Sequence, residues 1–142
     1  MIYLADKSAW AQLPFSEAAQ ERFQSLHEAY QLAICAPIAA ELLFSARNEV
    51  ALRRQREDLD SLRWLPLSPD AERRMFDVQQ MLARRGHHRS VGVVDLLVAV
   101  TAEHVGAVVL HYDGDFERIA RVTGQAHEWI VPRATGHGAT PP

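Results

Sequence analysis

The amino-acid sequence predicts a single α/β domain with a mainly parallel central β-sheet flanked by helices. Short apolar runs alternate with longer stretches of helical periodicity, which is typical of parallel strands joined by helical crossovers. The chain has 142 residues, the size of one ordinary domain, and 48% of them are hydrophobic, which suffices for one core. We therefore expect one domain over residues 1–132 and a flexible tail, rich in Gly, Pro and Thr, over residues 133–142.

The first predicted elements are a strand, a helix and a second strand. Residues 2–5 form a short apolar opening that ends abruptly at Asp6. Residues 16–30 have helical spacing, and Ser16 is suited to be the N-cap. The predicted apolar face of this helix consists of Ala19, Phe23, Leu26 and Tyr30. Residues 32–36 are compactly apolar, as a buried strand is.

The next segments predict two helices and a short strand. Pro37 suits the first turn of a helix, where its missing N–H costs nothing. Residues 49–62 have the pattern of a charged helix, and residues 63–67 that of a strand. The inward-facing residues of the charged helix are predicted to be Leu52, Leu59 and Leu62. Trp64 lies in the predicted strand, so we expect it in the core.

Two longer helices have clear signals at their ends. The helix over residues 68–85 begins with Ser68 as N-cap and Pro69 in its first turn. The helix over residues 93–105 is apolar nearly all round, which predicts burial. Gly106 follows it where a left-handed C-terminal glycine is common.

The last part of the domain predicts a strand, a turn, a helix and a final strand. Residues 107–112 form the first of these strands, and residues 113–115 are a tight polar turn. A short helix over residues 116–122 precedes the strand at residues 127–131. Trp129 lies in this strand and is expected in the core.

Charge and hydropathy narrow the class of protein. The formal net charge of −3 argues mildly against nucleic acid as a substrate, because proteins that bind phosphates usually carry a basic surface. That objection weakens if several acids share one site that divalent cations cover. No apolar run reaches the roughly 18 to 20 residues that span a bilayer, and the N-terminus lacks the basic region of a signal peptide. From these two absences we expect a cytoplasmic protein with no membrane partner. The lone Cys35, which can form no internal disulfide, is compatible with a reducing compartment.

Four acids are the most informative feature of the sequence. Asp6 and Asp113 directly follow predicted strands, and ligands of an open parallel sheet bind beyond the carboxyl ends of its strands. Glu41 lies about one turn into the helix that follows the second strand. Asp95 interrupts an apolar helical stretch, where a charge is costly unless it is paired or bound to a metal. We expect these acids to converge on one edge of the sheet.

Such a group of carboxylates predicts a cation site. Crowded carboxylates raise one another's pKa, and a divalent ion removes the conflict. Oxygen ligands without thiolates favour Mg²⁺ or Mn²⁺ over Zn²⁺. A metal held there can activate water and stabilise charge on a phosphodiester, while one acid orients or deprotonates the attacking water. The expected reaction is metal-assisted hydrolysis of a backbone phosphate.

Each acid also has a purely structural interpretation. Asp6 and Glu41 could be solvated, and Asp95 could pair with a buried arginine. Asp113 and Asp115 could simply build a turn. Asp115 either caps the helix that starts at Phe116 or contacts the metal. The functional interpretation depends on the set, because the structural ones do not explain why the acids follow strand ends or helix starts.

Four segments of the sequence resemble the motifs of the PIN-domain family. They are Ile2-Tyr-Leu-Ala-Asp6-Lys-Ser8, Ala36-Pro-Ile-Ala-Ala-Glu41-Leu-Leu, Val94-Asp95-Leu-Leu-Val-Ala and Leu110-His-Tyr-Asp113-Gly-Asp115-Phe. Each motif is weakly specific alone, but all four occur in order between Met1 and about Pro132. Within the family the layout is most similar to the VapC toxins.

The resemblance implies a fold and a function. It implies a PIN-like nuclease domain that cleaves RNA with Mg²⁺ or Mn²⁺, forms a homodimer and is held inactive by a VapB-type antitoxin. The acidic quartet corresponds to the four acids above, with three of them, Asp6, Asp95 and Asp113, as the expected metal ligands. Ser8 matches a hydroxyl that supports the site, and Asp115 is a fifth acid. Lys7 and His111 depart from the pattern, and His111 puts in doubt how the Asp113 turn is held.

Two further segments allow two interpretations each. Arg85, His88 and Arg89 belong to a basic stretch before Asp95, where they are expected either to contact RNA phosphates or to form a solvated helix end. Trp10, with its apolar neighbours, either packs in the core or lines a groove that receives the antitoxin's helix.

Two other function classes compete with the nuclease. The first is a catalytically inactive PIN-like module that only binds a protein or RNA partner, and the intact quartet argues against it. The second is a phosphoacceptor signalling domain, which needs an acidic pair after the first strand and a lysine after a late strand. The sequence has neither, because its single lysine is Lys7.

Overall fold

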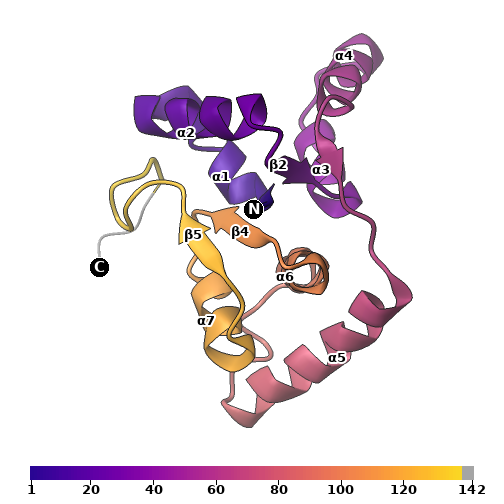
Figure 1. Cartoon of the computed structure of the whole chain (residues 1–142), viewed down its shortest axis with the longest axis vertical. Helices are drawn as coiled ribbons and strands as arrows, with labels where there is room; N and C mark the ends of the chain where they lie inside the picture. The colour runs from indigo at the N-terminus through magenta and orange to yellow at the C-terminus, as the bar shows by residue number, and fades with distance from the viewer. Residues whose placement is uncertain (139–142) are drawn as a thin grey trace.

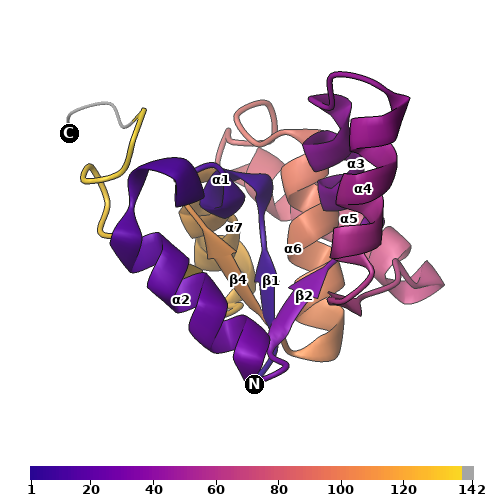
Figure 2. The same cartoon turned by 90° about the horizontal axis from the view of Figure 1, so that it is seen from above.

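The sheet of the molecule consists of five parallel strands (Figure 1). The computed structural model describes residues 1–138, so part of the expected tail, residues 139–142, lies outside the described residues. The strand order is β3-β2-β1-β4-β5, which puts β1 at the centre. Figure 2 shows β1 between β2 and β4. The strands are β1 (Tyr3–Ala5), β2 (Leu32–Ile34), β3 (Arg63–Trp64), β4 (Val108–His111) and β5 (His127–Trp129).

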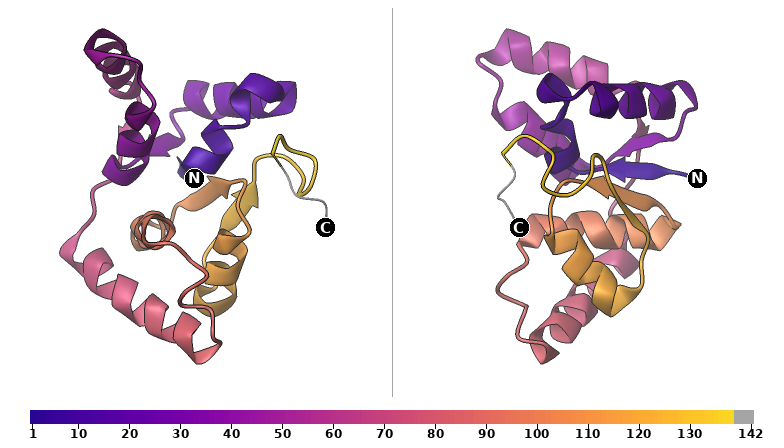
Figure 3. Two further views of the ribbon diagram at one scale, coloured as in Figure 1. Left: turned by 180° about the vertical axis from the view of Figure 1, so that it is seen from behind. Right: turned by 90° about the vertical axis from the view of Figure 1, so that its left-hand side faces the viewer.

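Helices connect the strands and cover both faces of the sheet. In chain order they are α1 (Lys7–Trp10), the 3₁₀ helix η1 (Leu13–Phe15), α2 (Glu17–Glu28), α3 (Ala36–Phe44), α4 (Glu49–Leu59), α5 (Pro69–Arg84), α6 (Val93–Val105) and α7 (Asp115–Thr123). Helices α5, α6 and α7 lie on one side of the sheet, and α1 and α2 lie on the other (Figures 1 and 3). The expected α/β architecture with a parallel sheet is confirmed. Among the described residues, no helix combines the length and apolarity that crossing a bilayer requires.

Each face of the sheet has its own core. On the α6 side, Leu4, Ile34 and Val109 pack against residues such as Val98 and Phe116. On the α2 side, the smaller core contains Phe23, Leu26 and Leu110 among others. Trp10 is half-buried, packs edge-to-face on Phe23 with ring centroids 4.8 Å apart, and donates its indole N–H to Ala5 O. Burial on both faces explains why the strands are apolar runs without alternation.

Local sequence signals set the ends of the helices as predicted. The Ser16 and Ser68 side chains cap α2 and α5 by accepting hydrogen bonds from Ala19 N and Ala71 N. Gly106 ends α6 at φ +68°, a left-handed conformation that favours glycine.

Several burial predictions were wrong. Trp64 is 43% exposed, because it lies in β3, a two-residue strand at the edge of the sheet. The indole N–H of Trp64 donates to Leu59 O. Tyr30 follows the end of α2 at φ +59° and is exposed rather than part of the apolar face. Leu52 is exposed, since α4 packs little of its surface and ends at Leu59. Trp129 is half-buried.

Candidate functional site

Asp6 occupies the position where the central strand meets α1. It directly follows β1, is 4% exposed, and caps α1. Its Oδ2 accepts hydrogen bonds from Ser8 N at 3.0 Å and Ser8 Oγ at 2.6 Å. Ser8 Oγ in turn accepts from Tyr112 N at 2.8 Å, just past β4. Ser8 therefore ties the first carboxylate to the end of the neighbouring strand.

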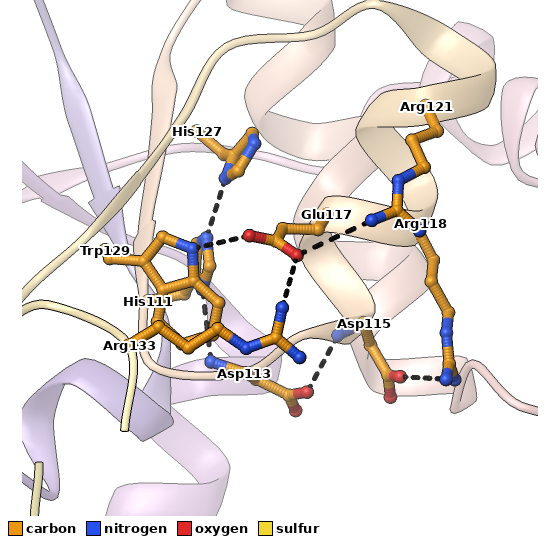
Figure 4. A network of polar contacts seen from close by, with 9 residues as sticks. All are labelled: His111, Asp113, Asp115, Glu117, Arg118, Arg121, His127, Trp129 and Arg133. Atoms are coloured by element: carbon orange, nitrogen blue, oxygen red, sulfur yellow. Dashed lines mark hydrogen bonds and ion pairs between the residues drawn. The ribbon is translucent and has the colours of Figure 1, made fainter. Parts of the chain in front are cut away.

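The turn after β4 holds two more acids. Asp113 follows the strand, and its Oδ1 accepts a hydrogen bond from Asp115 N at 2.9 Å (Figure 4). Asp115 is the first residue of α7, and the N-cap position belongs to Gly114. The capping role considered for Asp115 is therefore wrong: Asp113 organises the turn, and the Asp115 carboxylate is left for other partners.

The His111 imidazole positions the turn at Asp113 through a hydrogen bond to the backbone. Its Nδ1 accepts a hydrogen bond from Asp113 N at 3.1 Å, and its Nε2 lies 2.9 Å from His127 Nδ1. Because Nδ1 accepts an N–H, the ring hydrogen belongs on Nε2, which then donates to His127. The side chain is fully buried, and burial lowers the pKa of His111 to about 3. The residue that departs from the family pattern thus supports the Asp113 turn as a neutral imidazole.

Asp95 completes a close group with the two acids of the turn. It lies in the first turn of α6, and one carboxylate oxygen each of Asp95, Asp113 and Asp115 lies within 4.8 Å of the others. Burial, followed by the charges of Asp113, Asp6 and Asp115, raises the pKa of Asp95 to about 8. Burial, followed by the charge of Asp113, raises the pKa of Asp115, although the hydrogen bond with Asp95 and the charge of Arg118 oppose the shift.

Asp6 is an electrostatic neighbour of this group. Burial raises its pKa, the hydrogen bonds from Ser8 oppose that shift, and the charge of Asp113 adds to it. Glu41 is set apart from the group. It lies half-buried in α3, and its charge acts, together with that of Asp6, on the buried thiol of Cys35. Among the described residues, Glu41 belongs to no close set of possible ligands.

The three close carboxylates fit a divalent cation. They are half-buried, and burial, followed by repulsion from neighbouring carboxylates, raises the pKa of Asp95 and of Asp115. Among the described residues, the one ion pair of these three acids joins Arg118 Nη1 to Asp115 Oδ1 at 3.4 Å. The alternative interpretation of Asp95, a pairing with a buried arginine, is not found among the described residues. An all-oxygen donor set of this kind suits Mg²⁺ or Mn²⁺.

A second polar network adjoins the acids. Glu117, on α7, accepts hydrogen bonds from Trp129 Nε1 at 2.9 Å and Arg133 Nη1 at 3.0 Å (Figure 4). Arg121 lies 3.8 Å from the same carboxylate. The sequence indicates only the pairing of Glu117 with Arg121, through their spacing of four residues on one helix. Nothing local signals the contact of Arg133 with Glu117, and the sequence analysis missed it.

The basic loop, residues 86–92, directly precedes the helix that carries Asp95. Arg85 ends α5, and His88 and Arg89 follow in the turn before α6. All three side chains are exposed, as solvated residues or phosphate contacts would be. Lys7 is exposed as well.

Known proteins resemble the chain in sequence and in structure. The family model described as PIN domain matches residues 3–122. Ribonuclease VapC18 of Mycobacterium tuberculosis is 38% identical over 137 residues, which cover 95% of this chain and 99% of VapC18. These matches span nearly the whole domain, including the three segments that carry Asp6, Glu41 and Asp95 and the turn at Asp113.

Solved structures share the fold. VapBC2 of Rickettsia felis, bound to a DNA fragment from the promoter, gives a TM-score of 0.74 at 18% identity and covers 91% of this chain and 98% of its own. VapBC-5 of M. tuberculosis, a member of the VapBC family of toxin–antitoxin systems, gives a TM-score of 0.57 at 25% identity, with coverage of 92% and 98%. The chain therefore belongs to the PIN-domain family and, within it, to the VapC group.

Proposed function

We propose that this protein is a metal-dependent endoribonuclease and the toxin of a VapBC-type toxin–antitoxin pair. One observation carries the proposal: Asp95, Asp113 and Asp115 bring carboxylate oxygens within 4.8 Å of one another beside the buried Asp6. The name of the curated relative, a ribonuclease, supports the reaction. The VapBC structures that share the fold support the pairing with an antitoxin.

Each acid has a separate task in this proposal. Asp6, Asp95 and Asp113 hold Mg²⁺ or Mn²⁺, Glu41 is the fourth catalytic acid, and Asp115 supports the group. A divalent ion bound there supplies Lewis-acid stabilisation of the phosphodiester and a water with lowered pKa. Asp95 carries a proton at neutral pH, because its pKa is raised to about 8, and it must lose that proton to act as a ligand. Metal affinity should therefore rise with pH up to about 8.

Ser8 and His111 position two of the proposed metal ligands, Asp6 and Asp113, through hydrogen bonds. Ser8 holds the Asp6 carboxylate through two hydrogen bonds and binds the backbone of Tyr112 with its own oxygen. His111 holds the backbone of Asp113 from the other side of the turn. Both contacts fix an acid relative to β4, and such supporting contacts typically change metal affinity or activity by about 10-fold to 100-fold.

An RNA cleavage assay tests the reaction directly. The purified chain should cleave a labelled RNA mixture with Mg²⁺ or Mn²⁺ and lose activity in EDTA. The Asp95→Asn variant, checked for an unchanged circular dichroism spectrum, should be inactive. Cleavage in EDTA, or full activity of Asp95→Asn, would contradict the proposal.

Metal titration separates the nuclease from an inactive binding module. A ligand that binds only the folded state stabilises it, by about 2.7 kcal/mol at a concentration 100 times its Kd. Mn²⁺ should raise the melting temperature of the chain, and the rise should vanish in Asp95→Asn. No response at millimolar Mn²⁺ would favour the module that only binds a partner.

The loop before α6 is proposed to contact the RNA backbone. Arg85, His88 and Arg89 are exposed and lead directly to the helix that carries Asp95. Phosphate contacts of this kind carry no sequence information but contribute affinity that falls with salt. Replacing Arg85 and Arg89 by Gln should weaken RNA binding and reduce its salt dependence, whereas the cleavage pattern should stay the same.

The proposed partners are an antitoxin of the VapB type and a second copy of the chain. An apolar groove of about 400 Å³ runs between α1, α2 and α4, and its walls include Trp10, Phe23 and Leu62. A groove of this lining fits the apolar face of a partner helix. Co-expression with the antitoxin should abolish RNA cleavage, and Leu62→Glu should restore it. Light scattering on the free chain tests the homodimer.

A further inference from the structure

A polar pocket of about 370 Å³ lies beside the acidic group. Its lining includes Tyr112, Trp129, Arg133 and His137. Asp113 belongs both to this lining and to the acidic group, so the two sites are continuous. The volume falls within the range of roughly 300 to 1,000 Å³ that is usual for ligand pockets.

One wall of the pocket is the segment 133–138, which returns to the N-terminal part of the chain (Figure 3). Gln12, 4% exposed, clamps it with both ends of its amide: Oε1 accepts from His137 N at 2.8 Å, and Nε2 donates to His137 O at 3.1 Å. Phe15 stacks on the His137 ring with centroids 3.6 Å apart. Gly136 N donates to the Tyr112 hydroxyl at 2.7 Å.

Gly136 shows how closely this wall is fitted. A Cβ atom at that position would lie 2.5 Å from Tyr112 Cε1 and 2.6 Å from Gln12 Oε1. Both distances are shorter than real Cβ contacts, so any larger residue must displace the segment or the residues that hold it. The segment 133–138 therefore packs against Tyr112 and Gln12 with no room for a larger residue at position 136.

The chemistry of the pocket suits a nucleotide of a single-stranded nucleic acid. Tyr112 and Trp129 pack edge-to-face with centroids 5.4 Å apart, and the Arg133 guanidinium lies 5.6 Å from the centroid of the Trp129 ring. Proteins that bind unpaired RNA stack bases on aromatic rings and on arginine planes and neutralise the backbone with cations. Arg133 pairs with Glu117 through Nη1 at 3.0 Å, and the other N–H groups of its guanidinium are donors from which an RNA phosphate beside the acidic group can accept hydrogen bonds.

We propose that this pocket binds the RNA nucleotide next to the phosphodiester that is cleaved. Its base would lie against Tyr112 and Trp129, and Arg133 would contact a phosphate or the base. Bases of different size and hydrogen-bonding pattern would fill the pocket differently, so it contributes to the choice of cleavage site. The inference rests on the proposed function, since it names where the substrate of that reaction lies.

Three variants and a control test the pocket. Arg133→Gln removes the cation, Gly136→Ala displaces the wall, and Gln12→Met removes the clamp at similar volume. Arg73→Gln removes an equal charge from the exposed surface near the start of α5, where Arg73 pairs with Asp70. Each pocket variant should raise KM for RNA by roughly tenfold, equivalent to about 1.4 kcal/mol, with kcat within about twofold of wild type. The control should match wild type.

Binding without metal separates this proposal from the nuclease proposal. A labelled oligoribonucleotide, fully 2′-O-methylated and kept in EDTA, should bind the wild type and Arg73→Gln equally and the pocket variants about tenfold more weakly. If the wild type cleaves RNA while the pocket variants keep wild-type KM and oligonucleotide affinity, the pocket proposal is overturned and the nuclease stands. If the wild type does not cleave RNA but oligonucleotide binding still depends on Arg133, the nuclease proposal is contradicted and the pocket is supported as an RNA-binding site. Should Gly136→Ala misfold by circular dichroism, Arg133→Gln and Gln12→Met decide.

Discussion

Helices α3 and α6 each bring an acid toward the carboxyl ends of the strands, with different results. Asp95, in the first turn of α6, lies within the close group formed with Asp113 and Asp115. Glu41, the sixth residue of α3, lies outside it and acts on Cys35 instead. The acidic site is thus one-sided, concentrated between α6 and α7. A motif that places an acid on the right helix does not by itself place its carboxylate beside the others.

The largest expected effect comes from the α6 side. Asp95→Asn should lower kcat/KM for RNA cleavage by about 10³-fold or more, the scale seen when a group that stabilises the transition state is lost. The measurement is a time course of cleavage of a labelled RNA in saturating Mg²⁺. A loss of less than tenfold would break the comparison, since the reaction would then not depend on the acid of the close group.

The same substitution should change stability in a pH-dependent way. In the metal-free protein the pKa of Asp95 is raised to about 8 from 3.8, so the folded state holds a proton that the unfolded state releases. Its contribution to stability is present below pH 3.8 and is lost as pH rises to about 8. Asp95→Asn should therefore melt higher than wild type at pH 8, by a few degrees, and show no gain near pH 4. Equal gains at both pH values would contradict this.

A smaller effect is expected where the protein supports an acid. Ser8→Ala removes both the hydroxyl donor to Asp6 and the acceptor of Tyr112 N–H. We expect roughly a 10-fold to 100-fold loss of activity, as for other supporting contacts of metal ligands. Ser8→Thr, which keeps the hydroxyl, is the matched control and should retain most activity. Equal losses in both variants would point to packing rather than to the hydrogen bonds.

Metal affinity provides a second comparison between the close acidic group and Glu41 on α3. Asp115→Asn removes a carboxylate from the close group, whereas Glu41→Gln removes one outside it. Calorimetric titration with Mn²⁺ should show affinity falling by about tenfold for the first variant and by less than about threefold for the second. The reverse order would mean that α3 moves toward the group when metal binds.

The smallest expected effect concerns His111. In His111→Asn the amide oxygen can replace Nδ1 as acceptor for Asp113 N–H, whereas in His111→Gln the amide reaches the place of Nε2 instead. We expect His111→Asn to keep activity within about twofold and His111→Gln to lose about fivefold, close to the value of one hydrogen bond. Similar activities of the two variants would argue that the contact with Asp113 does not position the turn.

His111 also makes a pH prediction. Its pKa falls from 6.5 to about 3 on folding, so the folded state favours the neutral ring. The stability it contributes is present above pH 6.5 and is lost as pH falls toward 3. Relative to His111→Asn, the wild type should therefore lose stability between pH 6.5 and 4 in thermal melts. A constant difference over this range would show that folding leaves the pKa of His111 unchanged.

Much of the fold could be predicted because its signals are local. Ser16, Ser68 and Gly106 mark helix ends through contacts a few residues away. The edge of the sheet that carries Asp6 and Asp113 follows from the topology of parallel strands alone. What escaped prediction depends on distant residues: the exposure of Trp64 depends on how short β3 is, and the clamp between Gln12 and His137 joins residues 125 positions apart.

The site could be predicted only in part for a related reason. Its residues were found from their positions after strands and at helix starts, but distances between side chains on separate elements have no sequence signature. The different placement of Glu41 and Asp95 and the pairing of Arg133 with Glu117 therefore emerge only from the coordinates. The domain boundary at residue 132 stays a prediction.

The burial of Cys35 makes the molecule convenient to label. Its side chain is 1% exposed and its thiol pKa is raised to about 11, so the reactive thiolate is scarce at neutral pH. A maleimide dye should therefore not react with Cys35 in the folded protein. Thr135→Cys would then offer a single reactive sulfur on an exposed stretch of the chain, and the native cysteine need not be removed before fluorescence work.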